Sequence, residues 1–328
     1  MRLILAPMEG VIDATMRALL TDLGGIDRCV TEFVRVSQQL LPPRVFRRLC
    51  PELDSGGCTP AGVPVYVQLL GGQPSPMADN AARCAELGAP GIDLNFGCPA
   101  KTVNKSDGGA ILLQEPERVG SIVAAVRRAV PAGIPVTAKI RLGFEDRSQF
   151  LDNVLAIAAA GASEIAIHAR TRRDGYQPPA WWDEIARAVA QTSLPIVANG
   201  EIWSPEDARR CQLASQCQDL MLGRGALRRP DLPRLVRASL GGAPAEPMAW
   251  IDIAALLQHF FHCKRAQCEP RHAAGPVKQW LGYLRHYYPE AALLFAGIKR
   301  LIDPVAVSAA LDAHLATLQA GRDQPAAA

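Results

Sequence analysis

The sequence predicts a (β/α)8 TIM barrel that is followed by a small C-terminal helical bundle. Short apolar runs alternate with helical patterns from residue 3 to about residue 240, and this alternation is typical of parallel strands. About 250 residues is the usual size of such a barrel. After a run rich in Gly and Pro at 240–247 the strand pattern disappears, and only helical patterns follow.

Eight apolar runs are predicted to form the strands of the barrel, and they are residues 3–6, 29–33, 65–69, 91–94, 136–140, 164–168, 196–198 and 219–222. Stretches rich in Ala, Leu and Arg, such as 116–130 and 148–160, lie between them and are predicted helices. Pro116 and Pro205 mark helix starts, because proline fits the first helical turn. An open doubly wound sheet is the competing fold, but no Gly-x-Gly-x-x-Gly motif follows the first run.

Four units are predicted along the chain: a catalytic barrel over 1–240, a linker over 241–248, a helical domain over 249–320 and a disordered tail over 321–328. The helical domain is predicted to contain helices over 250–264, 277–288, 290–301 and 305–318. Pro289 and Pro304 mark boundaries between these helices, since a proline cannot continue the helix that precedes it.

The composition is that of an ordinary globular protein. Hydrophobic residues make up 49% of the 328 residues, and the net charge is only +3, so any contact with nucleic acid must depend on local patches. No apolar run is long enough to span a membrane, and Pro7 and Glu9 cut the first run too early for a signal peptide. The nine cysteines show no framework spacing, which predicts free thiols in a reduced, cytoplasmic protein.

Polar residues follow nearly every predicted strand. In a barrel of this kind the chemistry lies at the carboxyl ends of the strands. The residues in question are Glu9, Glu32, Gln68, Asn95, Cys98, Lys139, Arg141, His168, Arg170, Asn199, Glu201 and Arg224. Strand ends are often polar simply because they meet water, but exposure to water alone is a poor explanation for informative polar residues at all eight strand ends. Cys98 follows a break at Asn95-Phe96-Gly97, which would put a thiol at an exposed strand end, where it can donate a proton or attack a substrate.

Two glycine-containing turns, 199–200 and 223–225, follow the last two strands. Barrels commonly bind phosphate there, although both segments also fit ordinary tight turns. Lys139 lies in an otherwise apolar strand, where a cation is costly unless it meets an anion. The negative charge of a reduced flavin would meet that need, and a plain ion pair is the alternative. His168 fits a core histidine as well as a ligand-binding one.

Seven segments together resemble the tRNA-dihydrouridine synthase family: 6–10, 67–69, 95–99, 136–143, 168–171, 199–201 and 223–225. The Asn95-x-Gly97-Cys98-Pro99 motif is the specific one. The resemblance implies a flavin enzyme that reduces uridine in tRNA to 5,6-dihydrouridine and takes its electrons from NADPH. It implies that FMN is held by Pro7, Met8, Glu9, Gln68, Lys139, His168, Asn199, Gly200, Glu201, Gly223 and Arg224.

The resemblance also implies a division of labour in the chemistry. A hydride would pass from FMN to C6 of the uracil, and Cys98 would give a proton to C5 from the opposite face. Asn95, Arg141 and Tyr176 would hold the uracil. An ordinary thiol is mostly protonated at pH 7 and can donate to a carbanion-like centre. Since base stacking blocks both faces, the uridine must be extruded from its loop.

Three segments, 32–36, 44–46 and 277–285, resemble the bacterial class C enzymes of this family, which modify uridine 16 in the D-loop. The residues expected to contact tRNA are Arg35, Lys278, Gln279, Arg285 and Lys299. Lys278 and Arg285 are predicted to share one exposed helix face that contacts phosphates. Pro276 stands where the class has a basic residue, and Lys299 where arginine is expected, which bears on the uridine position rather than on the reaction.

Other readings remain at this stage. His259, His262, Cys263 and Cys268 fit no zinc pattern, so we expect no metal. We also expect a monomer that does not meet a membrane. A flavin dehydrogenase for free pyrimidines and a non-catalytic tRNA-binding protein are the competing functions. The helical domain with Lys278, Trp280 and Arg285 disfavours the first, and flavin binding would disfavour the second.

Overall fold

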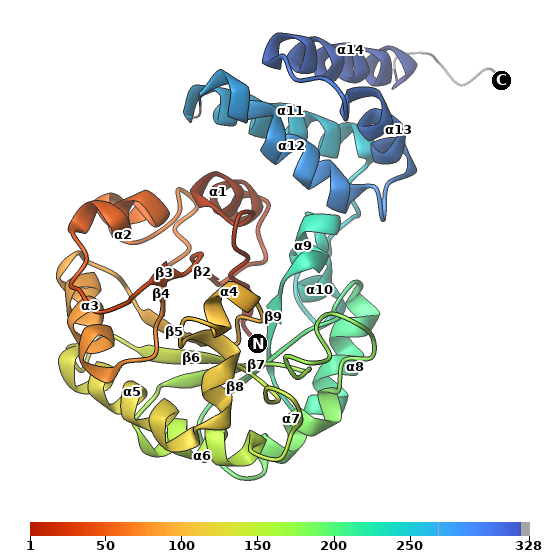
Figure 1. The fold of residues 1–328 in the computed structure, drawn as a ribbon. Coiled ribbons are helices and arrows are strands. Elements are labelled where there is room, and N and C mark those ends of the chain that lie inside the picture. The colour runs from red at the N-terminus through yellow and green to blue at the C-terminus, as the bar shows by residue number, and fades with distance from the viewer. Residues whose placement is uncertain (268, 323–328) are drawn as a thin grey trace.

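A computed structural model describes residues 1–267 and 269–322 of the chain. Its parallel strands close into a ring, because β2 pairs with both β1 and β4. The strands of the ring are β1 (Leu3–Leu5), β2 (Arg28–Val30), β4 (Val65–Leu70), β5 (Ile92–Phe96), β6 (Val136–Arg141), β7 (Glu164–His168), β8 (Ile196–Asn199) and β9 (Asp219–Leu222). Each corresponds to one predicted strand, so the predicted barrel is confirmed (Figure 1).

One further strand was not predicted. β3 (Val34–Arg35) pairs with the end of β4, with Val34 opposite Leu69 and Arg35 opposite Leu70. The strand predicted over 29–33 instead ends at Val30. Glu32 and Phe33, which follow in the segment between β2 and β3, line the cavity at the mouth of the barrel.

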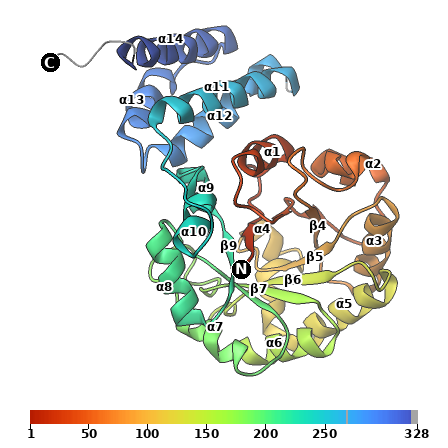
Figure 2. The same cartoon turned by 180° about the vertical axis from the view of Figure 1, so that it is seen from behind.

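Helices surround the ring, as Figure 2 shows from the back. They are α1 (Ala14–Asp22), α3 (Pro74–Glu86), α5 (Pro116–Ala129), α6 (Phe150–Ala159), α7 (Trp182–Val189), α8 (Pro205–Ser215) and α10 (Leu232–Ser239). Pro116 and Pro205 begin their helices as predicted. The Ser204 hydroxyl caps α8 by accepting a hydrogen bond of 3.0 Å from the backbone N–H of Asp207. Shorter helices, α2 (Pro43–Leu49), α4 (Lys101–Asn104) and α9 (Arg224–Arg228), lie in connecting segments.

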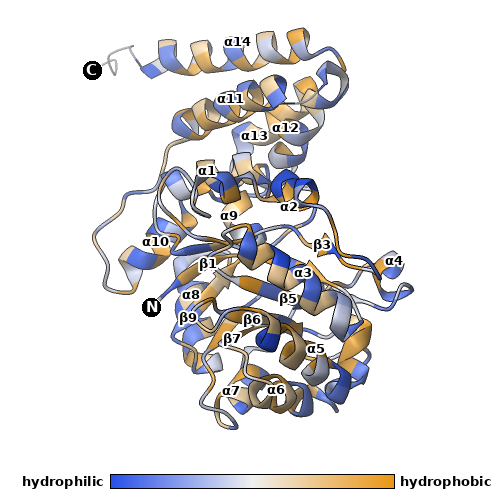
Figure 3. Cartoon of the chain, turned by 90° about the vertical axis from the view of Figure 1, so that its left-hand side faces the viewer, coloured by the Kyte–Doolittle hydropathy of each residue, from blue (hydrophilic) through white to orange (hydrophobic). Residues whose placement is uncertain are grey.

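The strands alternate strictly between two environments. Along β5, Ile92, Leu94 and Phe96 belong to the large core between the ring and the helices. Asp93 and Asn95 are buried on the opposite, inner side. A small separate cluster, which includes Ile4, Val197 and Met221, fills part of the barrel interior. In Figure 3 the strands are mostly orange, whereas the helices alternate between hydrophobic and hydrophilic residues.

Four helices form the C-terminal domain, which stands beside the mouth of the barrel (Figure 1). They are α11 (Trp250–Gln267), α12 (Pro270–Leu284), α13 (Pro289–Ile298) and α14 (Pro304–Arg322). Pro289 and Pro304 begin helices as predicted. The helix predicted from 277 begins at Pro270 and continues through Pro276, which lies inside it. The third helix ends at Ile298, short of the predicted 301.

The structure bears on two of the predicted segments, the linker over 241–248 and the tail over 321–328. α10 ends at Ser239 and α11 begins at Trp250, so no helix or strand falls within 241–248. The tail predicted to start at 321 is wrong for its first two residues, because α14 continues as regular helix to Arg322. The rest of that predicted tail, 323–328, lies outside the described residues.

Specific hydrogen bonds join the helical domain to the barrel. The indole N–H of Trp280 in α12 donates to the carbonyl of Leu227 in α9 at 3.0 Å, and Trp280 is 1% exposed. Its ring packs edge-on against Phe260, with 5.1 Å between the ring centroids. On the other side, Lys264 of α11 forms an ion pair with Asp13, the N-cap residue of α1. These contacts fix the helical domain over one side of the barrel mouth.

Truncating Trp280 should therefore loosen the domain junction. We expect Trp280→Ala to lower the free energy of unfolding by about 3–5 kcal/mol, because a large buried ring is lost. Trp280→Phe should lower the free energy of unfolding by about 1 kcal/mol beyond the loss expected from the smaller ring, since it also removes the hydrogen bond to Leu227. Urea denaturation measures both effects. Leu293→Ala on the surface of α13, where the side chain is 76% exposed, is the control and should change stability little.

Candidate active site

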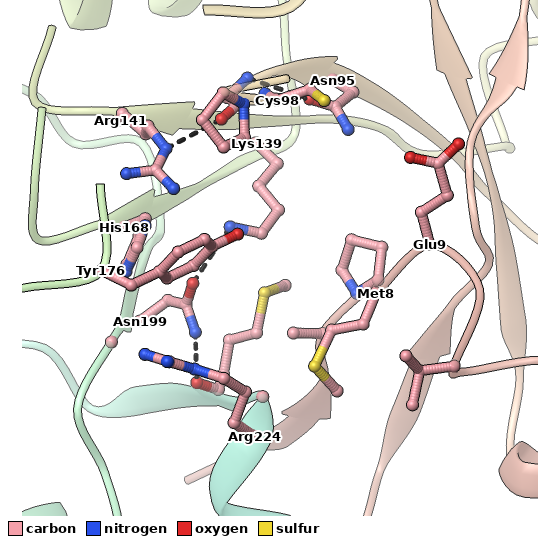
Figure 4. Close-up of a pocket in the computed structure, with 18 of the residues that line it drawn as sticks. Met8, Glu9, Asn95, Cys98, Lys139, Arg141, His168, Tyr176, Asn199 and Arg224 are labelled. Atoms are coloured by element: carbon pink, nitrogen blue, oxygen red, sulfur yellow. Dashed lines mark hydrogen bonds between the residues drawn. The ribbon is translucent and has the colours of Figure 1, made fainter. Parts of the chain in front are cut away.

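A cavity of about 650 Å³ opens at the carboxyl ends of the strands. All fifteen residues predicted to hold the cofactor, the uracil or the proton line it (Figure 4): Pro7, Met8, Glu9, Gln68, Asn95, Cys98, Lys139, Arg141, His168, Tyr176, Asn199, Gly200, Glu201, Gly223 and Arg224. They come from every strand end of the ring except that of β2, which contributes Glu32 instead. The structure thus gathers into one place residues that lie more than 200 positions apart in the chain.

Asn95 holds the loop that carries Cys98. The Oδ1 atom of Asn95 accepts hydrogen bonds from the backbone N–H groups of Gly97 and Cys98, each at 2.9 Å. The Nδ2 atom of Asn95 donates to Oε1 of Gln68 at 2.7 Å. Gln68 in turn donates to Asp93 at 2.7 Å. Most of the hydrogen-bonding capacity of Asn95 is therefore used to shape the loop.

A second asparagine supports the same loop from outside. Asn104 donates to the carbonyl oxygens of Cys98 and Ala100, at 3.0 and 2.7 Å. Gly109 has a φ of +73°, and a Cβ atom there would lie 2.8 Å from the carbonyl oxygen of Cys98. Glycine is required at this position, because a side chain would push the loop away. Burial raises the pKa of the Cys98 thiol above its ordinary value, so the thiol is protonated at neutral pH.

Three cations also line the cavity. The ammonium of Lys139 donates to Oδ1 of Asn199 at 3.0 Å, and Asn199 donates to the carbonyl of Met221 at 2.7 Å; Figure 4 shows Lys139 reaching toward Asn199. Arg141 donates to the carbonyls of Gly97 at 2.8 Å and Thr171 at 2.9 Å. The guanidinium of Arg224 lies 4.6 Å from the ring centroid of Tyr176 and 5.1 Å from that of Trp203.

Within the described part of the chain, none of these three cations forms an ion pair. Burial, with Arg141 nearby, lowers the pKa of Lys139 to about 8, which shows how costly its charge is in this place. Burial and the same cations hold the pKa of His168 well below its ordinary value, so this imidazole is neutral. A cavity with such a lining fits an anionic ligand.

The turn after β8 brings its backbone against His168. Gly200 has a φ of +118°, and a Cβ atom there would lie 2.8 Å from Cδ2 of His168. The next residue, Glu201, forms an ion pair with Arg170 and accepts a hydrogen bond of 3.3 Å from the indole of Trp203. The Glu201 carboxylate is therefore occupied, and Gly200 lines the cavity although its carbonyl accepts a hydrogen bond of 2.8 Å from the indole of Trp182.

The sequence model of the family described as "Dihydrouridine synthase (Dus)" matches residues 4–311. This chain belongs to the dihydrouridine synthase family. It is 51% identical over 320 residues to the tRNA-dihydrouridine(16) synthase of Pseudomonas putida, covering 98% of this chain and 99% of that protein. The proteins of the same name from Shewanella oneidensis and Haemophilus influenzae are 50% and 47% identical over 299 and 300 residues, covering 91% of this chain and 93% and 95% of theirs.

Two solved structures resemble this chain in fold. Histamine dehydrogenase from Rhizobium sp. 4-9 superposes with a TM-score of 0.54 at 13% identity, over 80% of this chain and 48% of that one. A variant of NCR from Zymomonas mobilis gives a TM-score of 0.51 at 14% identity, over 76% of this chain and 89% of that one. At such identities the likeness concerns the barrel architecture alone.

Twelve residues that line the cavity were not among the predicted site residues, and four of these carry an acidic or aromatic side chain: Glu32, Phe33, Trp203 and Tyr283. Glu32 is placed by the short bend after β2 and accepts a hydrogen bond of 3.1 Å from the N–H of Val11. Burial raises its pKa above the ordinary value. Trp203 lies two residues after the predicted Glu201 and could have been included with it. Tyr283 belongs to the helical domain, so its position depends on how the domains dock.

The five residues predicted to contact RNA lie outside the cavity. Arg35, Gln279, Arg285 and Lys299 are exposed, as that prediction requires. Lys278 is different, because it is half-buried and its ammonium donates to the carbonyl of Leu301. The prediction that Lys278 and Arg285 share one exposed face is wrong, since Lys278 ties α12 to the segment after α13.

No metal site or membrane span is found in the part of the chain that the structure describes. Cys263 lies 3.5 Å from His259, but no three His, Cys, Asp or Glu side chains among the described residues are arranged to hold a metal ion. Cys268 lies outside the described residues. Among the described helices, none is both long and apolar enough to cross a bilayer.

Removing the Asn95 side chain should free the loop that carries Cys98. We expect Asn95→Ala to raise the rate at which iodoacetamide alkylates Cys98 several-fold, because two loop N–H groups lose their acceptor. Mass spectrometry of the digested protein measures the rate for each cysteine separately. Cys58, which is partly exposed and lies elsewhere, is the internal control and should react at the wild-type rate. An unchanged rate at Cys98 would show that Asn104 and Gly109 hold the loop alone.

Proposed function

We propose that this chain reduces uridine 16 of tRNA to 5,6-dihydrouridine, with FMN as its cofactor and NADPH as the electron donor. The observation that carries the proposal is the position of the Cys98 thiol, which Asn95 holds in a cavity that Lys139 and Arg224 also line, in a chain of the dihydrouridine synthase family. The position within tRNA is supported by relatives about half identical over nearly the whole chain, whose name specifies position 16. Because the substrate is tRNA, we place the activity in the cytoplasm.

The cavity residues fit FMN. The volume of the cavity, about 650 Å³, lies within the usual range for small-molecule sites. Lys139 and Arg224 offer positive charge and form no ion pair with any carboxylate of the described residues, and the glycine at position 200 lets the backbone of that turn approach its neighbours closely. The phosphate would be held by Arg224 and the turns after β8 and β9, and Lys139 would stabilise negative charge on the ring. Bound FMN supplies the hydride for the reaction.

The chain's own residues hold and protonate the uracil. We assign the proton donor to the Sγ atom of Cys98, which would deliver its proton to C5. Arg141 and Tyr176 would contact the base, with the guanidinium 5.2 Å from the ring centroid of the tyrosine. Asn95 acts mainly by fixing the thiol, although its amide lines the same cavity. A neutral His168 beside them adds no further positive charge.

The RNA would reach this cavity by base extrusion, since a stacked uridine exposes neither face. We propose that residues 1–240 form the catalytic unit and residues 249–320 the RNA-binding unit. Arg35, Gln279, Arg285 and Lys299 are exposed and would contact the RNA, mostly at phosphates. Contacts of this kind set the orientation of the tRNA and so select which uridine reaches the barrel mouth.

Replacing Cys98 tests the proton donor and the substrate together. Cys98→Ala should retain FMN and bind tRNA normally, but form dihydrouridine about 10²–10⁴ times more slowly, because a positioned general acid is lost. Mass mapping of tRNA after incubation with NADPH measures both the amount and the position of dihydrouridine. The matched control is Cys263→Ala, also partly exposed, which should act as wild type. Dihydrouridine at position 20 instead of 16 would contradict the assigned position.

The pKa of Lys139 predicts how cofactor binding depends on pH. In the free protein this pKa is about 8, so the ammonium loses its charge as the pH rises through that value. The affinity for reduced FMN, whose ring carries the negative charge that Lys139 would meet, should therefore weaken as the pH rises through this value, in total by about tenfold for each unit by which bound reduced FMN raises this pKa. Anaerobic binding titrations with reduced FMN across this range measure the effect. Lys139→Arg keeps its charge and should show a flat profile, whereas an equal decline in that variant would show that another group titrates.

A further inference from the structure

One side chain of the helical domain reaches the catalytic cavity. Tyr283 of α12 lines the cavity, and every other lining residue belongs to the barrel. It is half-buried, and part of its ring packs against the core. Among the described residues its hydroxyl group forms no hydrogen bond, and its ring contacts no other aromatic ring. The remaining surface of the ring is therefore free to meet a ligand.

The barrel contributes Trp203 to the same cavity, and it is firmly held. Its backbone N–H donates to Asp207 at 3.1 Å, and its indole N–H donates to Glu201 at 3.3 Å. The guanidinium groups of Arg224 and Arg228 lie 5.1 and 5.5 Å from the ring centroid of Trp203. The cavity is thus lined by aromatic side chains from both domains, with Tyr283 from the helical domain and Phe33, Tyr176 and Trp203 from the barrel.

Tyr283 and Trp203 are joined through the protein. Arg228, which packs against Trp203, donates to the carbonyl of His286, and His286 follows Tyr283 in the same segment. Next to it, the bond from Trp280 to the carbonyl of Leu227 fixes α12 against α9. The placement of Tyr283 relative to the cavity is therefore set by hydrogen bonds rather than by a flexible linker.

Extrusion of a uridine unstacks the bases on either side of it. Aromatic side chains commonly hold such bases by stacking, and this contact tolerates any base because each has a π face. We propose that Tyr283, together with Trp203, stacks a nucleobase that neighbours the extruded uridine. This inference rests on the proposed function. The stacking contact is the means by which the helical domain selects the nucleotide that enters the cavity. A uridine whose neighbour cannot reach Tyr283 would enter poorly.

Three substitutions at Tyr283 separate stacking from bulk. Tyr283→Ala removes the ring, Tyr283→Leu keeps apolar volume without a π face, and Tyr283→Phe keeps the π face without the hydroxyl. We expect Ala and Leu to raise KM for tRNA about 5- to 100-fold, because one stacked base is lost, with a smaller change in kcat. Phe should remain within about twofold of wild type. Steady-state dihydrouridine formation on whole tRNA measures these values.

Two further measurements make the result specific. Tyr287→Ala is the matched control, because Tyr287 is a partly exposed tyrosine of the same domain, 45% exposed, that does not line the cavity. NADPH oxidation without tRNA should be the same in all variants. The stacking role would be overturned if Tyr283→Leu and Tyr283→Phe had equal KM values for tRNA. It would also be overturned if Tyr283→Ala and Tyr287→Ala had equal KM values. Either result would leave the proposed function intact. A wild-type protein that forms no dihydrouridine would overturn the proposed function itself.

Discussion

The chemistry of this protein depends on one amide side chain. Asn95 lies where β5 ends, and its oxygen accepts the two N–H groups that the chain would otherwise leave unpaired as it turns toward Cys98. Its nitrogen is anchored by Gln68, which is anchored by Asp93, and Thr137 donates to Asp93 at 2.6 Å. The inner faces of β4, β5 and β6 thus support a single loop. The thiol reaches a fixed place because the strands beneath it are rigid.

The same cavity holds positive charge that folding alone does not explain. Lys139 and Arg224 are half-buried in its lining and have no ion-pair partner among the described residues, and burial lowers the pKa of Lys139. Such unbalanced charge is tolerated where a ligand completes the site. The rest of the barrel, with its continuous apolar core between strands and helices, offsets the cost. Local instability at the mouth is therefore compatible with a stable fold.

The sequence predicted features that depend on short-range patterns. Short apolar runs located all strands of the ring, and Pro116, Pro205, Pro289 and Pro304 located helix starts, because proline lacks the N–H that a helix interior needs. Features decided by distant contacts were missed. β3 exists only because β4 pairs with it, the half-buried Lys278 is held by the segment after α13, and Tyr283 enters the cavity only because α12 docks on α9. Pro276 lies inside α12 because packing of the surrounding residues outweighs the lost hydrogen bond.

The central claim is that a protonated Cys98, held by Asn95, gives its proton to the uracil. Single-turnover reduction of tRNA by prereduced protein, followed from about pH 6 to pH 10, tests it most directly, because a thiol titrates within that range and a serine hydroxyl does not. The account predicts that the wild-type rate is constant through neutral pH and falls only above the raised pKa of the thiol. It predicts that Cys98→Ser reacts more slowly and shows no such fall. The same alkaline fall in both proteins would contradict the account.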